Sequence, residues 1–207
     1  MPNAVIWVFG GILLYLVSRP KIEIIDGSFS ETVNSVINDL EYRVLKISNM
    51  SSVDKSLVNH PQVKAILGLI RYGEGTYDAG GYKRLFGGGN FTSYVDHPRI
   101  VVTKNGYSSS AAGAYQALTK TWDETSAAMN LKDFSPANQD LFALGRIAAR
   151  GALNDVLTGK LDSAMRKLSR EWASLPYSPY GQPTISMAKA RSIYALNGGV
   201  PTDSAFA

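Results

Sequence analysis

The sequence predicts an α+β fold that is mostly helical, with a small glycine-rich β region and a hydrophobic helix at the N-terminus. Three observations support this. Apolar residues recur at helical spacing in several segments after residue 27. The stretch 76–110 is instead rich in glycines, aromatics and turn residues, and the first twenty residues hold an almost wholly apolar run. A chain of 207 residues has room for one domain of ordinary size and an appendage.

The apolar run at the N-terminus predicts a membrane anchor. Residues 4–17 contain no charged side chain, and a spanning helix needs about 20 apolar residues, with a lower limit near 17. No basic residue precedes the run, unlike the start of a cleaved secretory signal. We therefore expect residues 1–20 to form a transmembrane or signal-arrest anchor that contacts the membrane through residues 4–18. A buried hydrophobic helix is the alternative.

Residues 21–60 are predicted to form a helical connector. Ser28 and Glu31 have the spacing of a capping box, so a helix should start there. The polar segment Ser48–Asp54 predicts a loop after it. The apolar face of the 29–47 helix can pack on the main domain, which is the commoner outcome, or pair with a second copy of the chain. That face carries Phe29, Val33, Val36, Leu40 and Val44.

A compact, mainly helical domain is predicted over residues 61–207. Its first helix should bury one apolar face and end near Gly73-Glu74-Gly75. Short β runs are expected next, at 82–86 and 99–103. The helices expected after them cover 118–129, the segment from Pro136 to Gly151 with Ser135 as N-cap, a short stretch before Gly159, the segment around 161–172, and 185–196. A helical body with a glycine-rich β excursion after its first core helix is the outline of a lysozyme-like fold.

Composition excludes several classes of function. There are no cysteines, so disulfides, thiolate metal sites and a cysteine nucleophile are excluded. His60 and His97 are the only histidines, and no carboxylate motif for a metal accompanies them, so we expect neither a metal nor a cofactor. The net charge of +4 is spread along the chain. A basic surface suits nucleic acid, anionic lipid or an anionic wall polymer. No nucleic-acid-binding motif is present, so we expect no nucleic-acid partner.

Glu74 is the candidate catalytic residue. It stands where an apolar helix should end, between Gly73 and Gly75, and Gly75 lets the backbone turn sharply. Apolar neighbours such as Ile70 and Tyr72 would desolvate the carboxyl group and raise its pKa. A raised pKa is what a general acid needs in order to protonate a glycosidic oxygen. A solvent-exposed glutamate at a frayed helix end is the alternative, and local sequence alone favours it.

Two further segments have the composition of a sugar-binding surface. Tyr115 and Gln116 follow a stretch of small residues, 108–112, and can stack on and hydrogen-bond a sugar. Tyr180 and Gln182 lie among prolines and glycines, as is usual in a loop that lines a carbohydrate groove. An ordinary turn before a helix and a rigid structural loop are the respective alternatives.

Seven short motifs stand in a definite order between His60 and Gly199. They are Gly73-Glu74-Gly75-Thr76, Phe91 to Arg99, Ala112 to Gln116, Leu131 to Pro136, Arg150 to Leu153, Trp172 to Pro176, and Tyr180-Gly181-Gln182. Together they resemble the endolysin family that includes the bacteriophage lambda enzyme, a family of lytic transglycosylases. The chain departs from the lambda protein at Lys83 and Ala114, where that protein has Asp and Arg.

The resemblance implies that Glu74 matches the single catalytic glutamate of the family. It also implies that loops near 103–112 and 176–185 form the two lips of a substrate groove. Cleavage between N-acetylmuramic acid and N-acetylglucosamine would leave a 1,6-anhydro end. One carboxylate then suffices, because the sugar's own 6-hydroxyl is the nucleophile, whereas hydrolytic glycosidases usually use two. The substrate-binding candidates are Tyr115, Gln116, Asp96, Tyr180 and Gln182.

The expected function is that of a phage lytic transglycosylase acting on peptidoglycan glycan strands, for host lysis or for wall penetration at entry. A muramidase-type hydrolase and a non-catalytic peptidoglycan-binding membrane protein are the alternatives. We expect the catalytic domain to act in the host periplasm, anchored in the host inner membrane as a signal-arrest-release enzyme, or in a virion membrane. Arg19 and Lys21 follow the apolar run and argue weakly against this orientation.

Overall fold

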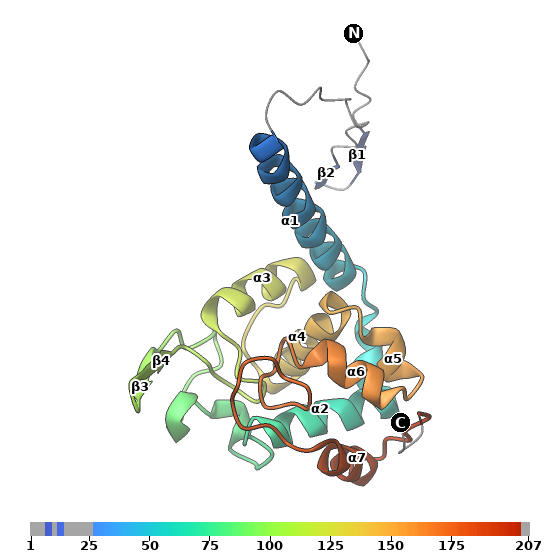
Figure 1. The fold of residues 1–207 in the computed structure, drawn as a ribbon. Coiled ribbons are helices and arrows are strands. Elements are labelled where there is room, and N and C mark those ends of the chain that lie inside the picture. Colours follow the sequence, from blue (N-terminus) through green and yellow to red (C-terminus); the bar gives the residue numbers. More distant parts are fainter. Residues whose placement is uncertain (1–6, 10–11, 15–26, 204–207) are drawn as a thin grey trace. The chain divides into compact units, whose positions relative to one another are not determined.

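The computed structural model describes residues 7–9, 12–14 and 27–203 (Figure 1). It divides the chain into two compact units, Met1–Glu41 and Tyr42–Ala207. The boundary lies within helix α1, which runs from Gly27 to Ser51, so the second unit starts earlier than the domain expected from residue 61.

The hydrophobic helix predicted at the N-terminus lies mostly outside the described residues. Its six described residues form two short antiparallel strands, β1 (Trp7–Phe9) and β2 (Ile12–Leu14), with Trp7 opposite Leu14. For these six residues the expected helix is wrong, because β-branched and aromatic residues predominate among them and favour strands. Of the helices in the described ranges, none has the length and apolar character that crossing a membrane requires. The anchor over residues 1–20 stays a prediction.

Helix α1 confirms the helix predicted near Ser28 but continues to Ser51, through part of the segment expected to be a loop. Tertiary packing explains the extension, because Met50 is fully buried in the core of the second unit. Val44, on the predicted apolar face, is 54% exposed. Whether this face pairs with a second copy stays a prediction.

The second unit is built around α2 (Pro61–Gly73). His60 caps this helix by accepting a hydrogen bond from the Gln62 N–H, and Pro61 occupies the first turn, where it costs no hydrogen bond. The predicted apolar face of α2 is buried as expected, and α2 packs on α7 (Met187–Leu196). The buried members of that face are Val63, Ile66, Leu67 and Ile70.

Four more helices complete the body of this unit: α3 (Thr119–Met129), α4 (Pro136–Ala149), α5 (Leu153–Leu157) and α6 (Leu161–Leu168). Ser135 caps α4 as predicted, with Pro136 in the first turn. Asn130, a non-glycine residue with a φ of 53°, caps the C-terminus of α3. Short 3₁₀ turns join the longer elements: η1 (Lys55–Asn59), η2 (Gly81–Lys83) and η3 (Phe86–Gly88).

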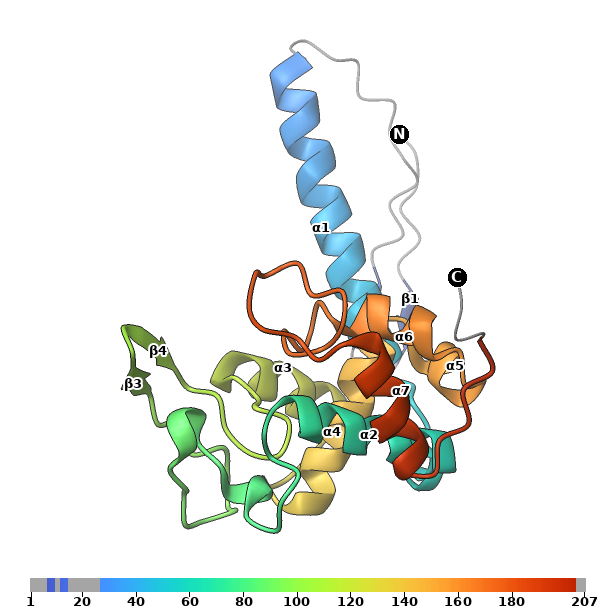
Figure 2. The ribbon, with the colours of Figure 1, turned by 60° about the horizontal axis from the view of Figure 1, so that its bottom comes forward.

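The described sheet of the second unit is the hairpin of β3 (Val102–Lys104) and β4 (Tyr107–Ser109). Asn105 and Gly106 both have positive φ, as a tight two-residue hairpin turn requires. The hairpin projects from one edge of the helical body (Figure 2). The strand predicted at 82–86 is reduced to two isolated antiparallel bridges between η2 and η3, in which Arg84 pairs with Asn90 and Leu85 with Ala112. Gly87 then turns the chain back with a φ of 82°. The α+β class, mostly helical with one small sheet beside the helices, is confirmed.

Candidate active site

Glu74 terminates α2, as the sequence predicted. Its N–H donates to the carbonyl oxygen of Ile70, and Gly75 follows with a φ of 68°. The next side chain, Thr76, is fully buried and donates from Oγ1 to the carbonyl oxygen of Ala114 over 2.5 Å. The turn that carries the glutamate is therefore fixed by α2 on one side and by a distant loop on the other.

The carboxyl group of Glu74 is partly buried and is held by a neutral partner. Ser174 Oγ donates to Glu74 Oε1 over 2.6 Å. Burial raises the pKa of Glu74, and the hydrogen bond from Ser174 opposes part of that increase. No ion pair between described residues involves this carboxyl group. A carboxyl group in this environment suits a general acid.

Gly73 is needed for the contact between Glu74 and Ser174. A Cβ atom at position 73 would lie 2.6 Å from Ser174 Oγ, closer than real Cβ contacts allow. The glycine on the N-terminal side of Glu74 thus makes room for the serine that binds its carboxyl group. Local sequence pointed to Gly73 but not to its partner, because the two are far apart in the chain.

Ser174 belongs to a segment that the core holds firmly. Trp172, two residues before it, is buried and donates its indole N–H to the carbonyl oxygen of Tyr115 over 3.1 Å. Leu175, directly after it, is fully buried. The N–H of Ile185 donates to the carbonyl oxygen of Ser174 over 2.9 Å and closes the base of the 176–185 loop.

Tyr115, predicted to bind sugar, is almost fully buried, and it lines a cavity together with Tyr82 and Asp140. It is 3% exposed, and its hydroxyl donates to Asp140 Oδ1 over 2.6 Å. Tyr82 donates to the same oxygen over 2.8 Å. Burial raises the pKa of Asp140, and the two phenol hydrogen bonds counteract this increase. The aromatic ring packs in the core, which is a structural role, and sugar binding by Tyr115 stays a prediction.

Gln116 lies in a turn that is tightly bonded to itself. Its Nε2 donates to the carbonyl oxygens of Gly113 and Arg84, and its own φ is 47°. The N–H of Ala114 donates to Gln139 Oε1, and a Cβ atom at position 113 would lie 2.3 Å from that oxygen. The side-chain N–H donors of Gln116 thus serve the fold in this structure, as expected for an ordinary turn.

Asp96 also makes its contacts within the protein. Its Oδ1 accepts from the indole N–H of Trp122, and its Oδ2 accepts from the guanidinium of Arg99. Arg99 bonds Asp123 as well, at 2.7 and 3.0 Å. Asp96 ties the loop before β3 to α3, and its side chain is 52% exposed.

Tyr180 and Gln182 are on the surface, as expected for the lip of a groove. Tyr180 is 56% exposed, with its hydroxyl donating to the carbonyl oxygen of Arg170. Gln182 is exposed in the same 176–185 loop. Of the five substrate-binding candidates, Asp96, Tyr180 and Gln182 are exposed, Gln116 is partly buried and Tyr115 is buried. Their binding of sugar stays a prediction.

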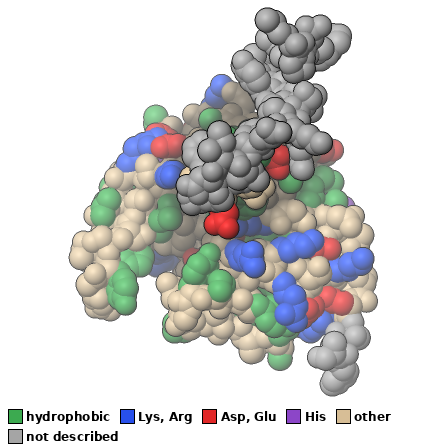
Figure 3. All heavy atoms as spheres, turned by 45° about the horizontal axis from the view of Figure 1, so that its top comes forward, with side chains coloured by type: hydrophobic (Ala, Val, Ile, Leu, Met, Phe, Trp, Pro, Cys, Tyr) green, Lys and Arg blue, Asp and Glu red, His purple; other side chains and the backbone are tan. Residues whose placement is uncertain are grey.

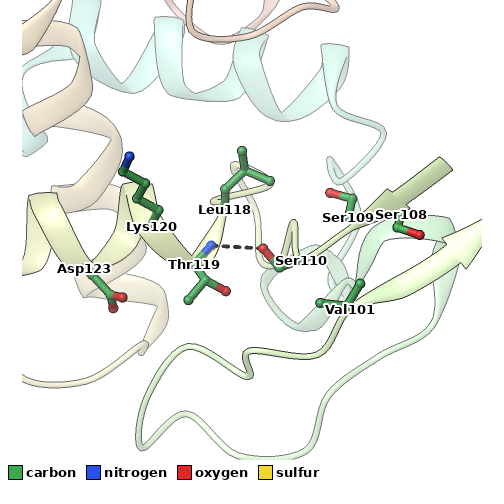
Figure 4. A pocket seen from close by; sticks show the side chains of 8 residues that line it. All are labelled: Val101, Ser108, Ser109, Ser110, Leu118, Thr119, Lys120 and Asp123. Atoms are coloured by element: carbon green, nitrogen blue, oxygen red, sulfur yellow. Dashed lines mark hydrogen bonds between the residues drawn. The ribbon is translucent and has the colours of Figure 1, made fainter.

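The second expected lip, 103–112, contains most of the β3–β4 hairpin and carries the exposed ring of Tyr107. A cavity of about 540 Å³ lies at its base, where Thr119 N donates to Ser110 Oγ (Figure 4). Hydroxyl groups predominate among its polar lining, which suits a polar ligand. Its lining consists of Val101, Ser108, Ser109, Ser110, Leu118, Thr119, Lys120 and Asp123.

The surface charges are mixed. On the face shown in Figure 3, lysines and arginines are interspersed with aspartates and glutamates. Within residues 27–203 and the short strands, no group of three or more His, Asp or Glu residues is arranged to hold a metal ion.

Comparison with known proteins agrees with this geometry. The endolysin family profile matches residues 64–201. The chain is 44% identical over 129 residues to the endolysin of Escherichia phage lambda, covering 58% of this chain and 81% of that protein. It is 34% identical over 158 residues to the endolysin of Escherichia phage P2, covering 69% and 96%.

Two solved structures of bacteriophage lambda lysozyme are similar to this fold. One, complexed with a chitohexasaccharide, has a TM-score of 0.65 and 37% identity. The other has a TM-score of 0.61 and 39% identity, and each match covers 69% of this chain and 97% of the other. The fold and the site around Glu74 thus define a lysozyme-like glycosidase. The chain belongs to the endolysin family.

Proposed function

We propose that this protein is a lytic transglycosylase that cleaves peptidoglycan glycan strands between N-acetylmuramic acid and N-acetylglucosamine. The observation that carries the proposal is the state of Glu74: a partly buried carboxyl group with a raised pKa, bonded to a neutral serine. Such a group holds a proton at a pH where an exposed glutamate has lost it, and can give that proton to a glycosidic oxygen.

Glu74 acts twice in the proposed reaction. It first donates its proton to the bridging oxygen, and the bond from that oxygen to C1 of the muramic acid breaks as positive charge develops at C1. The resulting carboxylate then accepts the proton of the muramic acid 6-hydroxyl, whose oxygen bonds to C1. The products are a free 4-hydroxyl on the leaving sugar and a 1,6-anhydro ring, and Glu74 is protonated again.

The electrostatic surroundings of Glu74 favour this route over hydrolysis. Burial raises the pKa of Glu74 and the Ser174 hydrogen bond opposes part of this increase, and among the described residues no carboxylate is a hydrogen-bond partner of Glu74. Hydrolytic glycosidases usually place a second carboxylate close by, to act on water or on the sugar. An intramolecular hydroxyl needs no such partner.

Analysis of the reaction products tests the proposal. Purified Gram-negative peptidoglycan is treated with the protein, and the fragments are identified by mass spectrometry. We expect anhydromuropeptides, each lighter by one water than the hydrolysis product. Reducing muramic ends would instead identify a muramidase. Glu74→Gln should release no fragments, whereas Glu31→Gln, at an exposed glutamate of α1, should behave as the wild type.

A non-catalytic peptidoglycan-binding protein is the remaining alternative. It would sediment with purified sacculi and release nothing, and Glu74→Gln would change neither result. The position of Glu74 within the stretch that the endolysin family profile matches argues against it.

We also propose that residues 4–18 hold the enzyme at a membrane, with the catalytic domain acting in the host periplasm. The uncharged apolar run supports this. Fractionation of infected cells and of purified virions would distinguish the host inner membrane from a virion membrane. Recovery of the full-length chain only in soluble fractions would contradict membrane anchoring.

A further inference from the structure

We propose that Ser174 is a positioning residue for the acid, one that orients the Glu74 proton toward the substrate and links Glu74 to the 176–185 loop. The inference rests on the proposed function, because it assigns a role within that reaction. It follows from three features: the direction of the hydrogen bond between the two side chains, the rigidity of the serine, and its position at the base of the loop.

The hydrogen bond determines which carboxyl oxygen is free. A serine hydroxyl has one donor, and Ser174 uses it on Glu74 Oε1 at 2.6 Å. In a neutral carboxyl group the carbonyl oxygen is the better acceptor, so Oε1 takes that role and the proton resides on Oε2. Ser174 therefore presents the acid as an Oε2–H donor, with the proton on the oxygen that the serine does not occupy.

The serine has little freedom to move away. A Cβ atom on Gly73 would lie 2.6 Å from its Oγ, so the helix backbone lies against the hydroxyl. On the other side, the carbonyl oxygen of Ser174 accepts the N–H of Ile185, and the adjacent Leu175 is fully buried. A hydroxyl confined in this way holds the carboxyl group in one orientation at a low entropic cost.

The same serine stands at the base of the 176–185 loop. The Ile185–Ser174 backbone hydrogen bond closes the loop, and Tyr177 and Tyr180 project from it with exposures of 43% and 56%. A glycan strand that contacts these rings contacts a segment whose base residue bonds the acid directly. Binding at the loop and orientation of the proton are thus connected through one residue.

A pH–rate profile distinguishes a positioning role from a purely structural one. Ser174→Ala removes a hydrogen bond that favours the charged form, so the pKa of Glu74 should rise further. The alkaline limb of kcat should move to higher pH, while kcat at its optimum should fall about tenfold or more because the proton is no longer oriented. KM should change little, since the serine touches the acid and not the sugar.

Two matched variants control this experiment. Ser174→Thr keeps a hydroxyl and should return the alkaline limb toward the wild-type position. Ser126→Ala removes a serine of α3 whose hydroxyl donates to the carbonyl oxygen of Asp123, and it should leave the profile unchanged. A folded Ser174→Ala protein with a wild-type alkaline limb and wild-type kcat would overturn the inference.

Direct titration of the Glu74 carboxyl group tests the role of Ser174 independently of the proposed function. The chain has six glutamates, so carboxyl carbons labelled with ¹³C give few signals, and the Glu74 signal is the one missing from Glu74→Gln. We expect this signal to titrate at higher pH in Ser174→Ala than in the wild type. An unchanged titration would refute the role of Ser174, whereas full activity of Glu74→Gln would refute the function itself.

Discussion

Trp172 donates its indole N–H to the carbonyl oxygen of Tyr115 over 3.1 Å, and this bond joins two segments that converge on Glu74. One segment carries Ser174, which bonds the carboxyl group. The other carries Ala114, which accepts the hydroxyl of Thr76 just beyond the glutamate. The acid is therefore supported from two sides by segments that are also bonded to each other.

Thr76→Val is expected to destabilise the protein by about 1–3 kcal/mol, because it leaves the buried carbonyl oxygen of Ala114 without its donor. Valine has nearly the shape of threonine, so packing is preserved. Urea unfolding measures the change. Thr76→Ser keeps the hydroxyl and should retain most of the stability; equal losses in both variants would show that the methyl group, not the hydrogen bond, matters.

Gly73→Ala should lower both activity and stability, because the new Cβ atom would lie 2.6 Å from Ser174 Oγ. Overpacking of this kind costs about 1–3 kcal/mol. In the double variant Gly73→Ala/Ser174→Ala the clash is relieved, so stability should recover while activity stays low. A double-mutant cycle from denaturant unfolding measures the coupling, and strict additivity would contradict a direct contact.

The raised pKa of Glu74 predicts a pH-dependent effect on stability. The folded state binds the proton more tightly than the unfolded state, so the free energy of unfolding falls as pH rises from the ordinary glutamate pKa through the raised one. Glu74→Gln, which is always neutral, should therefore be more stable than the wild type at neutral pH. The difference should shrink in acid. Urea titrations of both proteins across pH measure it, and a constant difference would argue against the raised pKa.

Tyr115→Phe tests the structural role assigned to this residue. Loss of the hydroxyl should cost about 1 kcal/mol of stability, because the half-buried Asp140 loses one of its two phenol hydrogen bonds and keeps the one from Tyr82. KM for glycan fragments should not change. Tyr82→Phe, which removes the other donor, is the matched comparison. A raised KM with unchanged stability in Tyr115→Phe would restore the sugar-binding interpretation.

The sequence predicts the local features of this fold well. The end of α2 follows from Gly73-Glu74-Gly75, and its buried face follows from the apolar spacing. The strand expected at 82–86 is limited to two isolated bridges, because the glycines after it reverse the chain. Local sequence patterns predict these elements because capping, turn and burial preferences act over a few residues.

The side-chain hydrogen-bond partners within the site could not be predicted from the sequence. Glu74 and Ser174 are 100 residues apart, and Tyr115 and Asp140 are 25 apart. Nothing in the residues around Tyr115 indicates that its hydroxyl binds a half-buried carboxyl group. A tyrosine after a stretch of small residues is therefore predicted to bind sugar. Side-chain pairing over such separations depends on the packing of whole helices.

The separation between Glu74 and Ser174 has a consequence for how the enzyme is made. During synthesis Glu74 leaves the ribosome 100 residues before the serine that orients its proton. The hydrogen bond from Thr76 to Ala114 likewise cannot form until Ala114, 38 residues later, has been synthesised. A nascent chain can thus build α2 early, yet its catalytic acid acquires its full set of contacts only after the segment bearing Trp172 and Ser174 has emerged and docked. Chains that end before Ser174 contain Glu74 but lack the hydrogen bond that orients its proton.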